Sequence, residues 1–156
     1  MNDFVTVALL ALTPVVELRG SIIYGHAVGL NLVLVVLISI IFNILAAPLT
    51  YFVLSFITDF FQHIPRFHRF WQKIVIRSQH KVRPTIERYG VAGLALFIGV
   101  PLPGTGVYTA AIGAYALGFK FKELLIATLL GVCIAATAVT TLVLLGNEAW
   151  LFMRSG

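Results

Sequence analysis

The segment from Gly20 to Thr58 contains no residue with a fixed charge. Two further segments, Tyr89 to Phe119 and Leu124 to Asn147, share this property. A soluble domain needs many charged side chains at its surface, yet 11% of the residues here are charged and 60% are hydrophobic. We therefore predict an all-α integral membrane protein.

Positive charge is concentrated in one window of the chain. The formal net charge is +5, and seven of the eleven Lys and Arg residues lie between Arg66 and Arg88. A basic block between apolar segments is typical of the cytoplasmic side of a bilayer, so we place loop 63–90 there and expect no nucleic-acid partner. Cys133 is the single cysteine, which excludes a disulfide or a cysteine zinc site within one chain.

The stretch GVPLPGTG, residues 99–106, interrupts the second apolar segment with two prolines and three glycines. A continuous helix cannot pass through it. Each flank is a half-helix of roughly 11 to 16 residues, or ~16 to 24 Å, which is too short for ~30 Å of hydrocarbon. Because Arg88 precedes the segment and Lys120 follows it, both ends are predicted to be cytoplasmic, as in a re-entrant helical hairpin.

The N-terminal region repeats this pattern. Residues 8–31 resemble residues 95–120, with a period of about 88 and a two-residue slip. Both contain a proline break, a half rich in small residues and a glycine exit (Pro14 and Gly29, then Pro101 and Gly118). A long hydrophobic helix follows each of them. Since a hairpin plus one crossing helix traverses the membrane once, two such units in series form inverted repeats, the plan of many secondary transporters.

We therefore predict one membrane domain, with repeat 1 in residues 1–62, a connector in 63–90 and repeat 2 in 91–156. A homodimer is expected, because it gives the hairpins more protein to pack against. The connector has the spacing of an amphipathic interfacial helix, which Pro84 is expected to end or bend. Its predicted contacts with anionic lipid, or with an anionic substrate, are Arg66, Arg69, Trp71, Lys73 and Arg77.

The first hairpin carries an acid and a base, Glu17 and Arg19, in an otherwise uncharged region. We expect Pro14 in the first turn of the second half-helix, with Thr13 as its N-cap. On a regular helix, residues two apart point about 200° away from each other. The structural interpretation is a buried ion pair, or an arginine that binds the freed carbonyls of the opposite hairpin tip.

The functional interpretation is a transport site, because charges inside a membrane are costly and tend to mark substrate pathways. Arg19 has a planar fork that suits phosphate or carboxylate, and a desolvated Glu17 takes up a proton near neutral pH. The predicted substrate and proton site consists of Glu17, Arg19, Pro14, Pro101, Pro103, Gly104, Thr105 and Gly106. His26 and Asn43 are candidates for lining its cavity.

With these motifs, TPVVELRGSIIYG at 13–25 and FIGVPLPGTGVYTAAIGAYALG at 97–118, the chain resembles the small multidrug export family of prokaryotic membrane proteins. That family is distantly similar to the DedA or VTT-domain superfamily, implicated in proton-dependent lipid translocation. The resemblance implies a multi-pass protein of the prokaryotic inner membrane, with Glu17 and Arg19 as the acid and base of the first hairpin. It also implies that Pro101, Pro103 and Gly104 form the second tip. DedA proteins carry an arginine in their second hairpin, whereas residues 102–115 here contain no charge.

These features predict a proton-coupled flippase or translocase for an anionic lipid-like substrate, of the polyprenyl-phosphate or phospholipid type. The alternatives are a small multidrug or cation exporter, for which Glu17 is the one intramembrane acid, and a non-transporting membrane scaffold. The sequence contains no Ser/His/Asp set, metal-ligand cluster or phosphate-binding loop, so we expect no enzyme activity, metal or cofactor.

Overall fold

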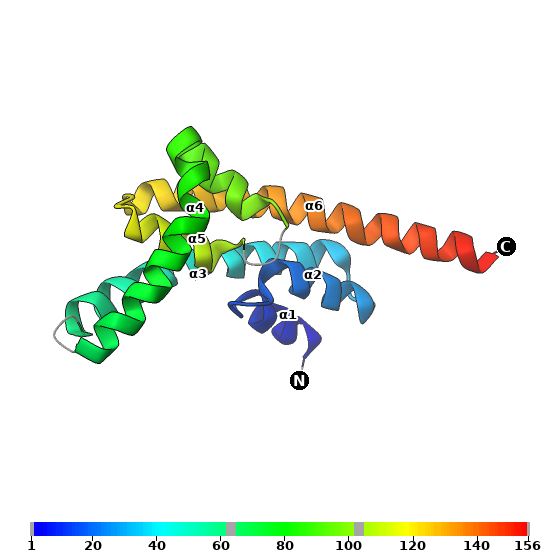
Figure 1. Ribbon diagram of the computed structural model, residues 1–156. Helices are drawn as coiled ribbons and strands as arrows, with labels where there is room; N and C mark the ends of the chain where they lie inside the picture. The colour runs from blue at the N-terminus through cyan, green and yellow to red at the C-terminus, as the bar shows by residue number, and fades with distance from the viewer. Residues whose placement is uncertain (1, 62–64, 102–104, 156) are drawn as a thin grey trace.

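The computed structural model describes residues 2–61, 65–101 and 105–155, and their side chains except those of residues 59, 61, 65–71, 74 and 147–155. This part of the chain forms six helices and no strand, which confirms the all-α prediction (Figure 1). The helices are α1 (Asp3–Ala11), α2 (Glu17–Ala27), α3 (Leu32–Phe61), α4 (Pro65–Gly99), α5 (Val107–Ala116) and α6 (Phe121–Ser155).

Two of the helices are long and apolar enough to cross a membrane. The apolar parts are Leu32–Thr58 in α3, with 27 residues, and Phe121–Gly146 in α6, with 26 residues. At 1.5 Å per residue each is about 40 Å long, more than the ~30 Å of a hydrocarbon core. Large apolar side chains on both helices are exposed, among them Phe56 at 66% and Leu142 at 61%. Such extensive apolar surface is typical of a protein that has lipid as its solvent.

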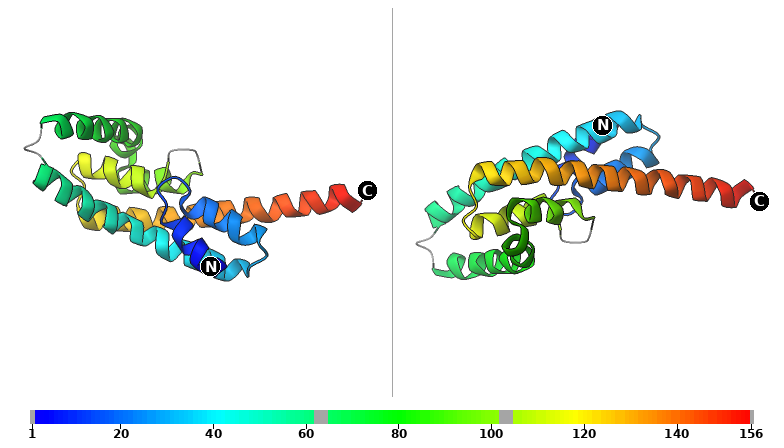
Figure 2. Two further views of the ribbon diagram at one scale, coloured as in Figure 1. Left: turned by 90° about the horizontal axis from the view of Figure 1, so that it is seen from below. Right: turned by 90° about the horizontal axis from the view of Figure 1, so that it is seen from above.

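The two long helices run in opposite directions beside each other, as Figures 1 and 2 show. Val36, near the start of α3, shares a pocket with Thr140 in the second half of α6. Tyr51, further along α3, contacts Phe121 at the start of α6, with ring centroids 5.3 Å apart. The start of α3 therefore lies beside the second half of α6, and the later part of α3 lies beside the start of α6.

Two pairs of short helices pack beside the long ones. Helices α1 and α2 contact each other and form the first pair. We take α5 and the part of α4 that follows Gly90 as the second pair, because they flank the second break and α5 also contacts α4. Helices α1, α2 and α5 have 9, 11 and 10 residues, so each is only ~14 to 17 Å long. Residues beside the two breaks contact each other, because Arg19 donates to Val100 and Thr105 and Tyr108 donates to Leu12.

Both pairs connect to the following long helix through the same kind of glycine turn. Gly29 after α2 has φ 75°, and Gly118 after α5 has φ 76°, a left-handed conformation that favours glycine. In each turn the next N–H donates to a carbonyl five residues earlier, Leu30 to Gly25 at 3.0 Å and Phe119 to Ala114 at 2.9 Å. This geometry is a Schellman motif, and its two copies stand at matching positions of the sequence repeat.

Helix α4 differs from the prediction in one respect. It continues through Pro84, so the expectation that this proline ends the helix is wrong. The interruption occurs instead at Gly90, where φ 56° and ψ −129° are non-helical. A positive φ is tolerated far better by glycine than by other residues, which explains why the chain turns there. The boundary between the expected connector, 63–90, and the second pair lies at this kink.

The first part of α4 packs on α5 through one face. Ser78, Val82 and Ile86 are buried, and a Cβ on Gly113 of α5 would come within 2.7 Å of a Val82 methyl group. The absence of a side chain at Gly113 therefore allows the close approach. Lys73 and Arg77 are exposed, whereas the side chains of Arg66, Arg69 and Trp71 lie outside the described residues.

Candidate functional site

The break in the first pair lies between Ala11 and Glu17. Pro14 is exposed in the intervening turn, so the prediction that it opens α2 is wrong. Thr13 is also not the N-cap: its hydroxyl donates to the carbonyl of Leu9 at 3.0 Å, at the end of α1. The Glu17 N–H donates to the Thr13 carbonyl at 2.9 Å, which closes the turn. Helix α2 therefore begins with Glu17 itself.

Glu17 has an unusual backbone conformation. Among the described residues it is the one non-glycine residue with a positive φ, 51°. Such a conformation is costly for a residue with a Cβ and is often associated with functional sites. It also removes Glu17 from the regular helical path, so that Glu17 and Arg19 both reach the second pair, although two-residue spacing on a helix would separate them.

The carboxylate of Glu17 lies at the N-terminus of α5. Its Oε1 accepts the Tyr108 N–H at 3.4 Å, and the Val107 N–H is a second backbone donor. The Glu17 side chain is buried, with 7% of the residue exposed. Because the N-cap of α5, Gly106, has no side chain to accept these donors, Glu17 supplies the cap from another helix, where a negative charge is favoured.

Arg19 binds backbone carbonyl groups at the C-terminal end of α4, as Glu17 binds backbone N–H groups at the start of α5. Its guanidinium donates to the carbonyls of Val100 at 2.9 Å and Ile98 at 3.4 Å. It also donates to the carbonyl and the hydroxyl oxygen of Thr105, at 2.5 Å and 3.1 Å. Carbonyls at a helix end have no partner within the helix, and a positive charge is stabilising there. Arg19 therefore connects the two sides of the second break.

The second pair and α3 in turn bind the end of α1. The Tyr108 hydroxyl donates to the Leu12 carbonyl, and the Asn43 side-chain amide donates to the Ala11 carbonyl at 3.1 Å. Asn43, considered for lining a cavity, is thus buried in a contact between α1 and α3. Tyr108 was not singled out from the sequence. The signal that could have identified it is its alignment with Arg19 in the repeat.

A pocket of about 390 Å³ opens beside Arg19. Its other lining residues are apolar and come from α2, the second break and α6: Ile23, Pro101, Val139, Leu142 and Val143. A single cation on an apolar wall fits an anion that carries an apolar body. His26, in the last turn of α2, is half-buried and does not line this pocket. Pro103 and Gly104 lie outside the described residues.

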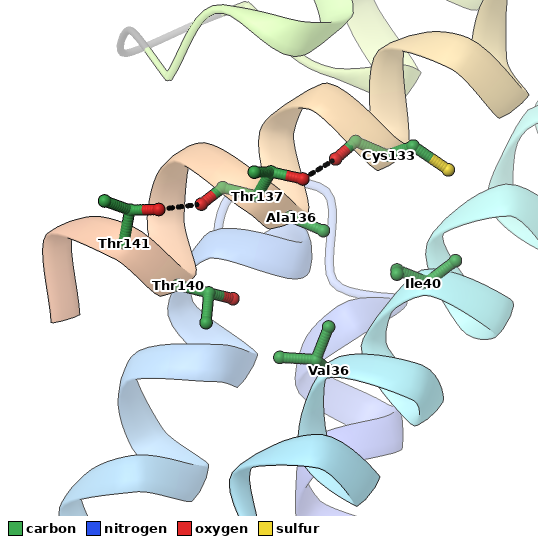
Figure 3. Close-up of a pocket in the computed structure, with 7 residues that line it drawn as sticks. All are labelled: Val36, Ile40, Cys133, Ala136, Thr137, Thr140 and Thr141. Carbon is green, nitrogen blue, oxygen red and sulfur yellow. Dashed lines mark hydrogen bonds between the residues drawn. The ribbon is translucent and has the colours of Figure 1, made fainter. Parts of the chain in front are cut away.

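A second pocket, of about 400 Å³, lies between α3 and α6 (Figure 3). Val36 and Ile40 form one wall, and the other consists of Cys133, Ala136, Thr137, Thr140 and Thr141. The hydroxyls of Thr137 and Thr141 donate to carbonyls one turn earlier, at 2.9 Å and 2.8 Å. None of its lining residues is charged. The pocket beside Arg19 is therefore the one suited to a charged substrate.

The chain matches one family model over most of its length. The family is described as "Putative small multi-drug export protein", and the match covers residues 17–138. Those residues include Glu17, Arg19 and both sides of the second break. No curated protein and no solved structure matches the chain.

Proposed function

Since the chain belongs to the small multi-drug export family, we propose that it is a membrane transporter whose substrate site lies where the two short helical pairs meet. The two pairs are then re-entrant hairpins, one entering from each side of the membrane. Short helices, antiparallel α3 and α6 and the matching turns at Gly29 and Gly118 support this inverted arrangement. Non-helical backbone at membrane depth is tolerated only where protein or a cavity surrounds it, as Arg19 and Glu17 provide here.

The proposed substrate is an anionic, lipid-like molecule of the polyprenyl-phosphate or phospholipid type. The observation that carries this proposal is the pocket in which Arg19 is the one charged lining residue among five apolar ones. A phosphate would bind at the guanidinium, while an isoprenoid or acyl chain would lie along Val139, Leu142 and Val143. Arginine suits a phosphate because its planar fork presents several donors at once.

Glu17 is proposed to couple this movement to protons. Its carboxylate is an acceptor for the first N–H groups of α5 and faces the positive end of that helix. Protonation would remove the negative charge and weaken the cap, which would loosen α5 from the first hairpin. The exposed basic residues of α4, including Lys73 and Arg77, favour a cytoplasmic location for that helix.

The family description supports export of drugs or cations as a second candidate function. In that case Glu17 would be the cation-binding group. Its carboxylate is engaged by backbone N–H groups and is not among the residues that line the pocket beside Arg19. The geometry therefore favours the anionic substrate.

Reconstitution into liposomes distinguishes these functions. Fluorescent polyprenyl phosphate, fluorescent phospholipid and a lipophilic cationic dye would each be tested with and without a proton gradient. We expect movement of an anionic lipid, at least tenfold slower in Arg19→Ala and Glu17→Gln, with Lys122→Ala at an exposed position as the matched control. Movement of the dye alone would favour drug export. Wild-type rates in both site variants would refute the proposed site.

A further inference from the structure

Tyr108 occupies in the second repeat the position that Arg19 occupies in the first. Aligning residues 8–31 with 95–120, with the slip after the break, also places Gly106 against Glu17. Both aligned side chains donate across the interface between the pairs. Arg19 donates to Ile98 and Val100 at the end of α4, and Tyr108 donates to Leu12 at the end of α1.

We propose that Tyr108 is a positioning residue for transport. Its hydroxyl holds the first tip, the turn that follows α1, through the Leu12 carbonyl, and the Arg19 guanidinium holds the second tip, the turn that follows α4, through the Ile98 and Val100 carbonyls. We call these two contacts latches. This proposal rests on the proposed transport function. Carbonyl groups at membrane depth need donors. Those of Ile98, Val100 and Thr105 receive them from Arg19, and that of Leu12 receives one from Tyr108. The two breaks consequently hold each other through crossed contacts, in addition to the bonds that each forms within itself, Glu17 N–H to the Thr13 carbonyl and the Thr105 hydroxyl to the Val100 carbonyl.

The two latches differ in strength. Arg19 is a permanent cation with donors to several oxygens around the second break, whereas Tyr108 offers a single neutral hydroxyl. Hydrogen bonds to charged groups contribute more than neutral ones. The Tyr108 contact is therefore the one that opens first when the tips separate.

Tyr108 also connects the latch to the acid. Its backbone N–H donates to the Glu17 carboxylate, and its hydroxyl donates to Leu12 five residues before Glu17. A change in the protonation of Glu17 would thus be transmitted to the end of α1 through one residue. The fold does not depend on the hydroxyl alone, because Asn43 binds the neighbouring Ala11 carbonyl independently.

The test combines hydrogen–deuterium exchange with transport in the full-length protein. Tyr108→Phe should raise exchange of the amides in residues 12–17 roughly tenfold, the effect of losing one hydrogen bond, and leave residues 98–101 unchanged. Arg19→Gln should produce the reverse pattern. Tyr115→Phe, on the same helix and in ring contact with Tyr51 at 5.3 Å, is the matched control and should change neither segment.

In the liposome assay, Tyr108→Phe should change the turnover number severalfold while KM for the anionic lipid stays constant. Unchanged exchange in residues 12–17 would overturn the latch. Altered exchange with a wild-type turnover number would show a structural contact only, which would overturn the positioning role. If the wild-type protein moves none of the lipids, the proposed function fails, and the exchange pattern alone decides whether the two latches exist.

Discussion

A side chain at position 106 would overlap with the carboxylate of Glu17, because an ideal Cβ built on Gly106 lies only 2.6 Å from Glu17 Cδ. The backbone of Gly106, with φ 172°, is extended and open to any residue. The glycine is therefore required by the approach of Glu17 and not by the local conformation. The contact at position 106 therefore shows that Glu17, from the first pair, packs closely against the start of α5.

The substitution Gly106→Ala should displace the Glu17 carboxylate from the α5 N-terminus while the helices still form. We expect transport in liposomes to fall at least tenfold, with little change in circular dichroism. Gly146→Ala is the matched control, because a Cβ there meets nothing within 4 Å. A Gly106→Ala protein that transports at the wild-type rate would contradict the role assigned to Glu17.

Replacing Arg19 with lysine keeps the positive charge but removes the planar guanidinium group with its several N–H donors. An ammonium group cannot hold the oxygens of Val100, Ile98 and Thr105 together. Arg19→Lys should therefore abolish most transport and lower the free energy of unfolding by about 1–3 kcal/mol, because the part-buried contacts to the Ile98 and Thr105 carbonyls lose their donor. Thermal denaturation in detergent measures the second effect, with Lys73→Arg on the exposed face as control. Equal melting temperatures for Arg19→Lys and the wild type would be inconsistent with this account.

Gly131 should be intolerant of even a methyl group. A Cβ at this position of α6 would lie 2.6 Å from the Ala95 carbonyl oxygen and from the Ile98 Cβ, both on α4. Gly131→Ala should destabilise the protein by about 1–3 kcal/mol through overpacking. Gly146→Ala, in the open part of the same helix, should instead stabilise it by about 0.5–1 kcal/mol. Opposite signs in a denaturation assay are the expected result, and equal shifts would argue against the close contact.

Replacing Thr128 with valine should stabilise the protein. It is fully buried in α6, and its hydroxyl has no partner among the described residues. Because a buried donor without an acceptor costs free energy, Thr128→Val should raise the unfolding free energy by about 1–3 kcal/mol. Thr50, whose hydroxyl donates to the Ala46 carbonyl at 2.7 Å, provides the control. A melting temperature of Thr128→Val below that of Thr50→Val would reject the prediction.

The local features of this fold were readable in the sequence. The breaks near Pro14 and at residues 99–106 depend on proline and glycine, whose backbone constraints act wherever these residues stand. The two long apolar helices could be predicted from the length of the apolar runs alone. The helix does not end at Pro84, because a proline can remain inside a long helix that packs on a neighbour, while Gly90 provides the positive φ of the kink.

The contacts between the pairs could not be read in the same way. The position of the Glu17 carboxylate depends on the left-handed backbone conformation of Glu17. This conformation could not be predicted from the residue type. Asn43 and Tyr108 find their acceptors, Ala11 and Leu12, only because distant segments fold together. The sequence supplied the possibility that Arg19 binds carbonyls of the opposite tip, and the structure shows which carbonyls they are.

The glycine turns at Gly29 and Gly118 have a mechanical consequence. Each turn is closed by backbone hydrogen bonds, so we expect a long helix and the short helix before it to move together, as the two arms of one bent lever. Relative motion is then expected mainly at the opposite ends of the short helices, at the centre of the molecule. A ligand that tilts the outer end of α3 or α6 would shift the levers and control the centre from a distance, without ever entering it.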